Sequence, residues 1–133
     1  MRLWVVRRGG DAEQNLLTPA WEARLPLLTA YAVGPRGKQP VSASGLTLSR
    51  RGILVTAFGG DLYGAQTLLR LWEQAGKAGD CVVQLPAGCP AAQALPVNLR
   101  GEPAGAPLPI RNHAFTVHLD AFAPASFVLE GLR

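Results

Sequence analysis

The chain has 133 residues and a formal net charge of +4, from 13 Lys and Arg against 9 Asp and Glu. A chain of this length is expected to fold as one domain that buries about two-thirds of its unfolded surface, and its composition excludes a disordered protein. The basic residues are spread from Arg2 to Arg133 without forming a stripe, so we expect no nucleic-acid partner. The 15 Gly and 11 Pro, with recurring β-branched and aromatic runs, favour short strands joined by turns.

The first 44 residues contain two segments with the alternation of strands. Residues 3–8 (LWVVRR) and 27–33 (LLTAYAV) alternate, and between them we expect a loop with one turn of helix within 11–24. The apolar run near the N-terminus is too short for a signal sequence or a membrane span, so no membrane partner is expected. Residues 1–44 belong either to one domain with the rest of the chain, 1–133, or to the tail of a preceding domain.

Residues 45–74 carry three apolar runs separated by compact turns, which is typical of a β-meander. Residues 45–49 and 53–58 flank the turn Arg50-Arg51-Gly52. This spacing predicts a hairpin in which Gly52 supplies the positive φ.

Periodicity leaves the end of this stretch, residues 67–74 (TLLRLWEQ), open between a helix and a strand. Leu68, Leu69 and Trp72 fall at helical spacing, whereas Leu69 and Leu71 lie two positions apart, as in a strand. A helix is therefore a serious alternative here on the residues alone.

Further strands are expected in the second half of the chain. Residues 81–85 (CVVQL) are β-branched and extended in character. Three prolines between 86 and 96 confine that segment to an edge strand or a loop, and 97–99 are expected to pair briefly. Residues 115–119 show the clearest alternation, and 125–130 (ASFVLE) form a last strand. The chain is therefore predicted to be all-β, an antiparallel β-sandwich of about six to nine short strands.

No combination of residues predicts a catalytic or metal site. The nine acids mostly lie in or next to turns, without a pair that shares an apolar cleft. On one strand His113 and His118 would point to opposite faces, while Asp120 shares the face of His118 and could pair with it. Cys81 and Cys89 form no CxxC motif, are expected to lie too far apart for a disulfide, and do not decide the compartment. We therefore expect no catalytic residue, no metal ligand and no cofactor.

Aromatic residues give the candidate binding residues. Sugar-binding modules stack exposed planar rings on pyranose faces, and Tyr63 lies in a glycine-rich loop next to Asp61. Tyr63, Asp61 and Trp21 are the candidates for contacts with carbohydrate. For Trp4, Trp21 and Trp72, packing in a core or an interface is the stronger alternative, because large rings dominate burial.

A series of short motifs in the second half carries a resemblance to a known family. They are Leu69–Glu73 (LRLWE), the turn and strand at 76–85, residues 97–101 (VNLRG) and residues 121–130 (AFAPASFVLE). From Gln66 onward the chain resembles the C-terminal β-sandwich module of family 38 α-mannosidase-like glycoside hydrolases, in which the first of these strands has the form LRLxE. The segment 97–101 departs from the acidic form found in that family.

The resemblance implies a strand at 67–74. It also implies an upstream catalytic domain in the same polypeptide, which holds the metal and the catalytic carboxylates; no catalytic residue carries over to this chain. The chain is then expected to be a non-catalytic accessory domain that packs against the catalytic domain, with the turn at 59–65 as the place for a ligand. The alternatives are a carbohydrate-binding module and a structural or interaction domain unrelated to sugars.

Overall fold

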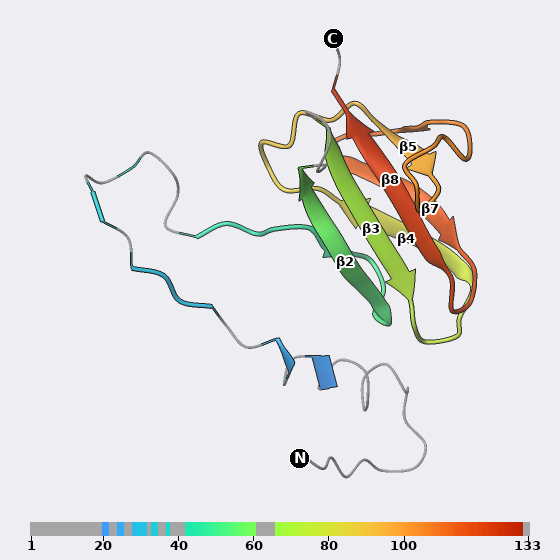
Figure 1. Cartoon of the computed structure of the whole chain (residues 1–133), viewed down its shortest axis with the longest axis horizontal. Coiled ribbons are helices and arrows are strands. Elements are labelled where there is room, and N and C mark those ends of the chain that lie inside the picture. Colours follow the sequence, from blue (N-terminus) through green and yellow to red (C-terminus); the bar gives the residue numbers. More distant parts are fainter. Residues whose placement is uncertain are drawn as a thin grey trace.

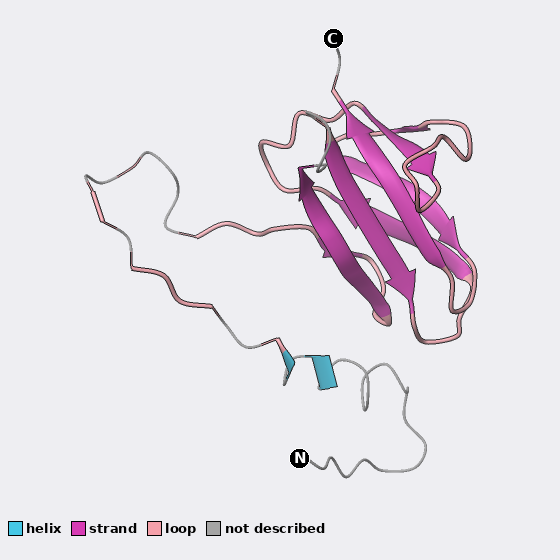
Figure 2. Cartoon of the chain, viewed as in Figure 1, coloured by secondary structure: helices cyan, strands magenta, loops and turns pink. Residues whose placement is uncertain are grey.

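The protein is an antiparallel β-sandwich, as the sequence predicts (Figures 1 and 2). The computed structural model describes residues 20–21, 24–25, 28–31, 33–34, 37, 42–60 and 66–131. One sheet has the strand order β1-β4-β7 and the other the order β2-β3-β8-β5-β6. None of the helical residues described belongs to a helix long and apolar enough to cross a membrane. The strands are β1 (Thr47–Leu48), β2 (Ile53–Gly60), β3 (Thr67–Glu73), β4 (Gly79–Gln84), β5 (Gln93–Val97), β6 (Leu108–Pro109), β7 (Ala114–Leu119) and β8 (Pro124–Glu130).

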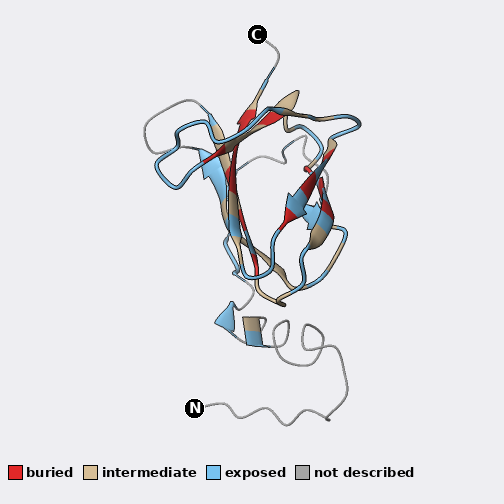
Figure 3. Ribbon diagram, turned by 90° about the vertical axis from the view of Figure 1, so that its right-hand side faces the viewer, coloured by how far each residue is buried: buried red, intermediate tan, exposed pale blue. Residues whose placement is uncertain are grey.

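The core lies between the two sheets, and buried residues occur on strands of both sheets (Figure 3). In β7 every second residue from Phe115 to Leu119 is buried, which confirms the alternation seen in the sequence. In the other sheet, Leu69 and Leu71 of β3 are fully buried as well. The rings of Phe115 and Phe127 meet edge-on with centroids 5.5 Å apart, an arrangement that aromatic pairs favour. The core thus joins β7 of one sheet to β8 of the other.

The ambiguous stretch 67–74 contains a strand and not a helix. β3 pairs antiparallel with β2 on one side and with β8 on the other. Both edges of its backbone are therefore hydrogen-bonded within the sheet, and its side chains alternate between the core and the outer face.

The predicted hairpin at 45–58 is wrong. β1 pairs with β4 in the three-stranded sheet, whereas β2 pairs with β3 in the five-stranded sheet. The turn at 49–52 therefore carries the chain from one sheet to the other. Gly52 does have a positive φ of 82°, as the turn sequence predicts.

Backbone hydrogen bonds explain why this turn separates the two strands. The N–H of Ser49 donates to the carbonyl of Val82 in β4 at 3.0 Å. The carbonyl of Gly52 accepts from the N–H of Gln74, directly after β3, at 2.8 Å. Each half of the turn is bound to a different sheet, and a turn signal in the sequence does not reveal which strands its two ends will pair with.

The proline-containing segment is more regular than expected. β5 covers Gln93–Val97 and pairs with both β8 and β6, while Leu99 lies in a turn. The carbonyl of Pro96 accepts from the N–H of Ala104 at 2.8 Å, so the backbone of the proline faces away from β8. On that side β6 pairs only with Gln93 and Ala94, and no strand requires an N–H from Pro96.

The N-terminal expectations are met only in part. The described residues of 27–33 form no strand, and the strand expected at 3–8 lies outside the described residues. Helical residues at 20–21 and 24 agree with the expected turn of helix. The exposed fractions of Leu28, Tyr31 and Val33 are 95%, 94% and 89%.

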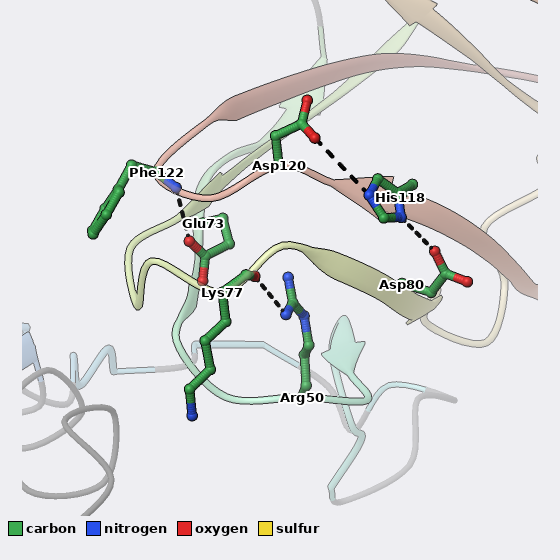
Figure 4. Close-up of polar contacts among 7 residues, drawn as sticks. All are labelled: Arg50, Glu73, Lys77, Asp80, His118, Asp120 and Phe122. Atoms are coloured by element: carbon green, nitrogen blue, oxygen red, sulfur yellow. Dashed lines mark hydrogen bonds and ion pairs between the residues drawn. The ribbon is translucent and has the colours of Figure 1, made fainter.

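A buried carboxylate connects two turns at one end of the sandwich (Figure 4). Glu73 is fully buried, and its Oε1 accepts from the N–H of Ala75 at 3.0 Å. Its Oε2 accepts from the N–H groups of Gly76 and Phe122, each at 2.9 Å. Burial alone would raise the pKa of this carboxyl, but backbone N–H donors at Phe122, Lys77, Ala75 and Gly76 outweigh burial and lower the pKa. Glu73 therefore holds the β3–β4 turn to the β7–β8 turn.

We predict that Glu73→Gln lowers the free energy of unfolding at neutral pH by about 2–4 kcal/mol, because the amide replaces an acceptor with a donor that faces backbone N–H groups. The folded-state pKa lies below the unfolded value, so the carboxylate stabilises the fold above the unfolded pKa of about 4.3, and this contribution is lost as the pH falls through the folded pKa. Denaturant unfolding from neutral pH to about pH 2 should show a smaller acid-induced loss in the variant than in the wild type.

The exposed carboxylate of Glu102 provides the control. Glu102→Gln should change the free energy of unfolding by no more than about 0.5 kcal/mol. Equal stability and equal pH dependence of Glu73→Gln and the wild type would contradict the role given to Glu73.

Candidate functional site

The two outer faces of the sandwich differ in chemistry. The outer face of the three-stranded sheet is polar, and Asp80 and His118 are directly opposed on it with 2.8 Å between Oδ1 and Nδ1. This is the composition expected of a sheet face in contact with water. Its outward residues are Asp80, Val82, Gln84, Ala114, Thr116 and His118.

The outer face of the five-stranded sheet is mainly apolar. The register of β2, β3, β8 and β5 aligns its side chains in rows across the four strands. Its apolar members lie outside the core cluster between the sheets. Trp72 is 44% exposed, Leu54, Leu68 and Leu95 are half-buried, and Val97 and Val128 are buried. We call this surface the Arg70–Trp72 face; it consists of Leu54, Leu68, Arg70, Trp72, Leu95, Val97, Ser126 and Val128.

Arg70 lies near the centre of this face. Its Nε donates to the hydroxyl of Ser126 on β8 at 3.1 Å, and its carbonyl accepts from the hydroxyl of Thr56 at 3.2 Å. Within the described part of the chain, no carboxylate forms an ion pair with Arg70. A half-buried guanidinium oriented by a neutral hydroxyl is suited to bind a carboxylate from outside the domain, because its planar fork matches that group.

Two aromatic side chains lie at one end of the face. Trp72 is 44% exposed, and its Nε1 donates to the carbonyl of Phe122 at 3.2 Å. Phe122 is 67% exposed and has a φ of 59°, which is rare for a bulky residue. A Cβ at Gly76 would lie 2.5 Å from the Phe122 ring, so the ring packs directly on this glycine. With the bond from Phe122 N–H to Glu73, these contacts hold both rings in place.

The structure describes one of the three predicted binding residues, Trp21. Trp21 is half-buried, and its Nε1 donates to the side-chain oxygen of Gln74 at 2.9 Å. Asp61 and Tyr63, and most of the predicted ligand loop, lie outside the described residues.

Sequence reasoning missed Arg70, Trp72 and Phe122 as surface-site residues. Once 67–74 is taken as a strand, Leu68, Arg70 and Trp72 share one face, so the signal for two of them was present. This signal did not identify a site, because the sequence alone does not show that the outer face of the other sheet is polar. For Phe122 the sequence shows no signal, since its positive φ arises from contacts with distant residues.

His118 lies between two carboxylates on the exposed surface. The expected pair of His118 and Asp120 is present, with Nε2 and Oδ1 3.9 Å apart, but the shorter contact of His118 is to Asp80. Among the described residues, no group of three or more His, Cys, Asp and Glu could hold a metal ion.

The two cysteines are free thiols, with Cys81 buried and Cys89 half-buried. Cys89 and His113 line an open surface pocket of about 590 Å³, together with Pro90, Ala91, Ala92, Ile110 and Asn112. The described lining residues include no carboxylate, so this pocket combines a thiol and an imidazole without an acid to orient them.

Comparison with known proteins does not identify a family. No family model, no curated protein and no solved structure matches the chain. The Arg70–Trp72 face is therefore interpreted from its own chemistry.

The positive φ of Phe122 allows a stability prediction. Phe122→Ala and Phe122→Gly both remove the ring, but only alanine retains the conformational cost of about 1 kcal/mol for a left-handed backbone. The glycine variant should therefore be more stable than the alanine variant by about 1 kcal/mol in urea unfolding.

Leu99 serves as the matched control, because it is an exposed turn residue without a positive φ. There Leu99→Gly should be no more stable than Leu99→Ala. If the glycine variant were no more stable than the alanine variant at position 122 either, the backbone of Phe122 would not be strained.

Proposed function

We propose that this chain is a non-catalytic β-sandwich domain that docks on a neighbouring domain of the same polypeptide through the Arg70–Trp72 face. The observation that supports the proposal is the contrast between a polar outer face on one sheet and an apolar outer face on the other. Trp72 is exposed on this face and Leu54, Leu68 and Leu95 are half-buried, and apolar surface that remains in contact with water commonly marks an interaction site. Trp and Arg, which lie next to each other on this face, are the residue types enriched among those that dominate binding energy.

The chemistry of the face specifies the surface that it fits. The leucine and valine side chains require an apolar patch on the partner. The neighbouring domain must also place an Asp or Glu next to Arg70, near Ser126. Without a carboxylate, burying the guanidinium in the interface would cost free energy. Such a charge pair fixes the orientation of two otherwise apolar surfaces.

The resemblance in Leu69–Glu73 gives a first candidate for the neighbour, the catalytic domain of an α-mannosidase-like glycoside hydrolase. The strand divides its residues between two tasks that suit an accessory domain: Leu69 and Leu71 fill the core, while Arg70 and Trp72 face outward. In this proposal the chain itself carries no catalysis. Hydrolysis of aryl glycosides by the purified chain, retained after chelation, would contradict it.

Thiol labelling of the complete gene product tests the docking proposal. Leu95→Cys places a thiol on the Arg70–Trp72 face, and Thr116→Cys places one on the polar outer face, both in a Cys89→Ser background. We expect labelling at position 95 to be at least about tenfold slower in the complete product than in the 133-residue chain, because a docked domain excludes the reagent. Labelling at position 116 should be the same in both proteins.

Adding Arg70→Glu should restore fast labelling at position 95, because it reverses the charge that the docked carboxylate requires. Equal labelling of position 95 in both proteins would contradict docking through this face. A reading frame that encodes only these residues would contradict the accessory-domain part of the proposal.

The second candidate function is carbohydrate binding, which the exposed and fixed rings of Trp72 and Phe122 favour. Flat aromatic rings held in one orientation stack on a sugar ring with little loss of side-chain entropy. Titration of mannose-rich or plant oligosaccharides, followed by tryptophan fluorescence, should then give a response that Phe122→Ala weakens. Absence of any response at about millimolar sugar, where Kd corresponds to only about 4 kcal/mol of binding free energy, would exclude this function.

A further inference from the structure

The outer edge of β7 borders a cleft between the two sheets. β7 pairs with β4 on one side, and within the described residues no strand pairs with its other side. A cleft of about 330 Å³ lies along that side, and Thr116, Val117 and His118 of β7 line it. The other wall comes from the five-stranded sheet, and its residues that belong to or pack against the core are all apolar: Leu108, Ala125 and Phe127.

Two residues of β7 direct their backbone groups toward this cleft. The N–H of Ser49 donates to the carbonyl of Val82, so the backbone groups of Val82 in β4 face β1. Val82 lies opposite Thr116, and backbone groups alternate in direction along an antiparallel ladder. The N–H and C=O of Thr116 therefore point away from β4. Those of His118, two positions further on, point the same way.

The chain itself covers the edge of β7 only at Ala114. Both backbone groups of Ala114 bond to Arg111, at 2.9 Å each. Thr116 and His118 then present two N–H and two C=O groups that bond to no other backbone group within the described residues. An extended backbone supplies donors and acceptors with this same spacing, so the group that fits the edge is a peptide strand.

We propose that β7 binds an extended peptide in which a basic residue is directly followed by an apolar one. The peptide adds antiparallel, as all the strands of both sheets do. Two of its residues pair with Thr116 and His118, and the residue between them lies opposite Val117. Directly opposed residues point to the same face of a sheet, so the middle side chain enters the apolar cleft. This contact is separate from the Arg70–Trp72 face.

The charge beside the edge specifies the basic residue. The peptide residue opposite His118 lies on the polar outer face, where the carboxylates of Asp80 and Asp120 flank the imidazole (Figure 4). The side chain of Asp120 is 84% exposed, so a lysine or arginine of the peptide is complementary to it. A second copy of β7 that used the same four backbone groups would place the uncharged Thr116 opposite His118. Charge complementarity therefore favours a separate basic peptide over a second copy.

An NMR titration of the full chain with the peptide acetyl-Thr-Lys-Leu-Thr-amide tests the proposal. The amide signals of Thr116 and His118 should shift saturably at about millimolar peptide, and these amides should exchange hydrogen more slowly in the complex. Methylation of the lysine backbone N–H should weaken binding at least about tenfold, because this N–H faces β7. Methylation of the leucine backbone N–H is the matched control and should leave the affinity unchanged, because that N–H faces away.

Two protein variants separate the parts of the contact. Asp120→Asn should weaken binding of the lysine peptide about threefold and leave binding of an alanine-for-lysine peptide unchanged. Arg70→Glu should bind the peptide like the wild type, which distinguishes this contact from docking through the outer face.

Three results would overturn the proposal. The first is the absence of saturable shifts at about 10 mM peptide, and the second is equal weakening by the two methyl groups. The third is a shift of the Thr116 and His118 amides when the chain is diluted without peptide, since it would show that a second copy pairs with this edge.

Discussion

The core of the sandwich and the outer face of the five-stranded sheet both depend on the alternation of side chains along β3. β3 is hydrogen-bonded on both edges, so its side chains have only two directions available, into the core or onto the outer face. Leu69 and Leu71 take the first direction and are fully buried. Arg70 and Trp72 are thereby required to lie on the outer face, beside apolar residues that β2, β8 and β5 contribute in the same rows. One strand in this way sets both the packing of the core and the chemistry of the exposed surface.

The end of β3 adds a second constraint, an electrostatic one. Glu73 points into the core side of the strand, where a carboxylate is stable only if its oxygens accept hydrogen bonds. Backbone N–H groups from two turns satisfy it, and this fixes the turn that carries Phe122 relative to Trp72. The aromatic end of the Arg70–Trp72 face therefore depends on a buried charge and not on packing alone.

The surfaces of the domain follow from its layered architecture. A two-layer sandwich has two outer faces and several sheet edges, and each must be solvated, covered or paired. The face with Asp80 and His118 is solvated. The Arg70–Trp72 face has the composition of a covered surface, and within the described residues the outer edge of β2 pairs with no strand. Docking on a neighbour is the proposal for the Arg70–Trp72 face.

Much of the fold could be read from local pattern, because strand alternation and turn residues act over a few positions. The sequence by itself determined the all-β class, the strands at β4, β7 and β8, and the positive φ of Gly52. It left β3 open between helix and strand, since both periods fit Leu68 to Trp72, and the strand was preferred only through a resemblance. Tertiary structure decided that β1 and β2 lie in different sheets, because Ser49 and Gly52 bond to partners far along the chain. It also decided the candidate site: the apolar face exists only once β2, β3, β8 and β5 lie side by side, and the backbone of Phe122 is set by a carboxylate 49 positions away.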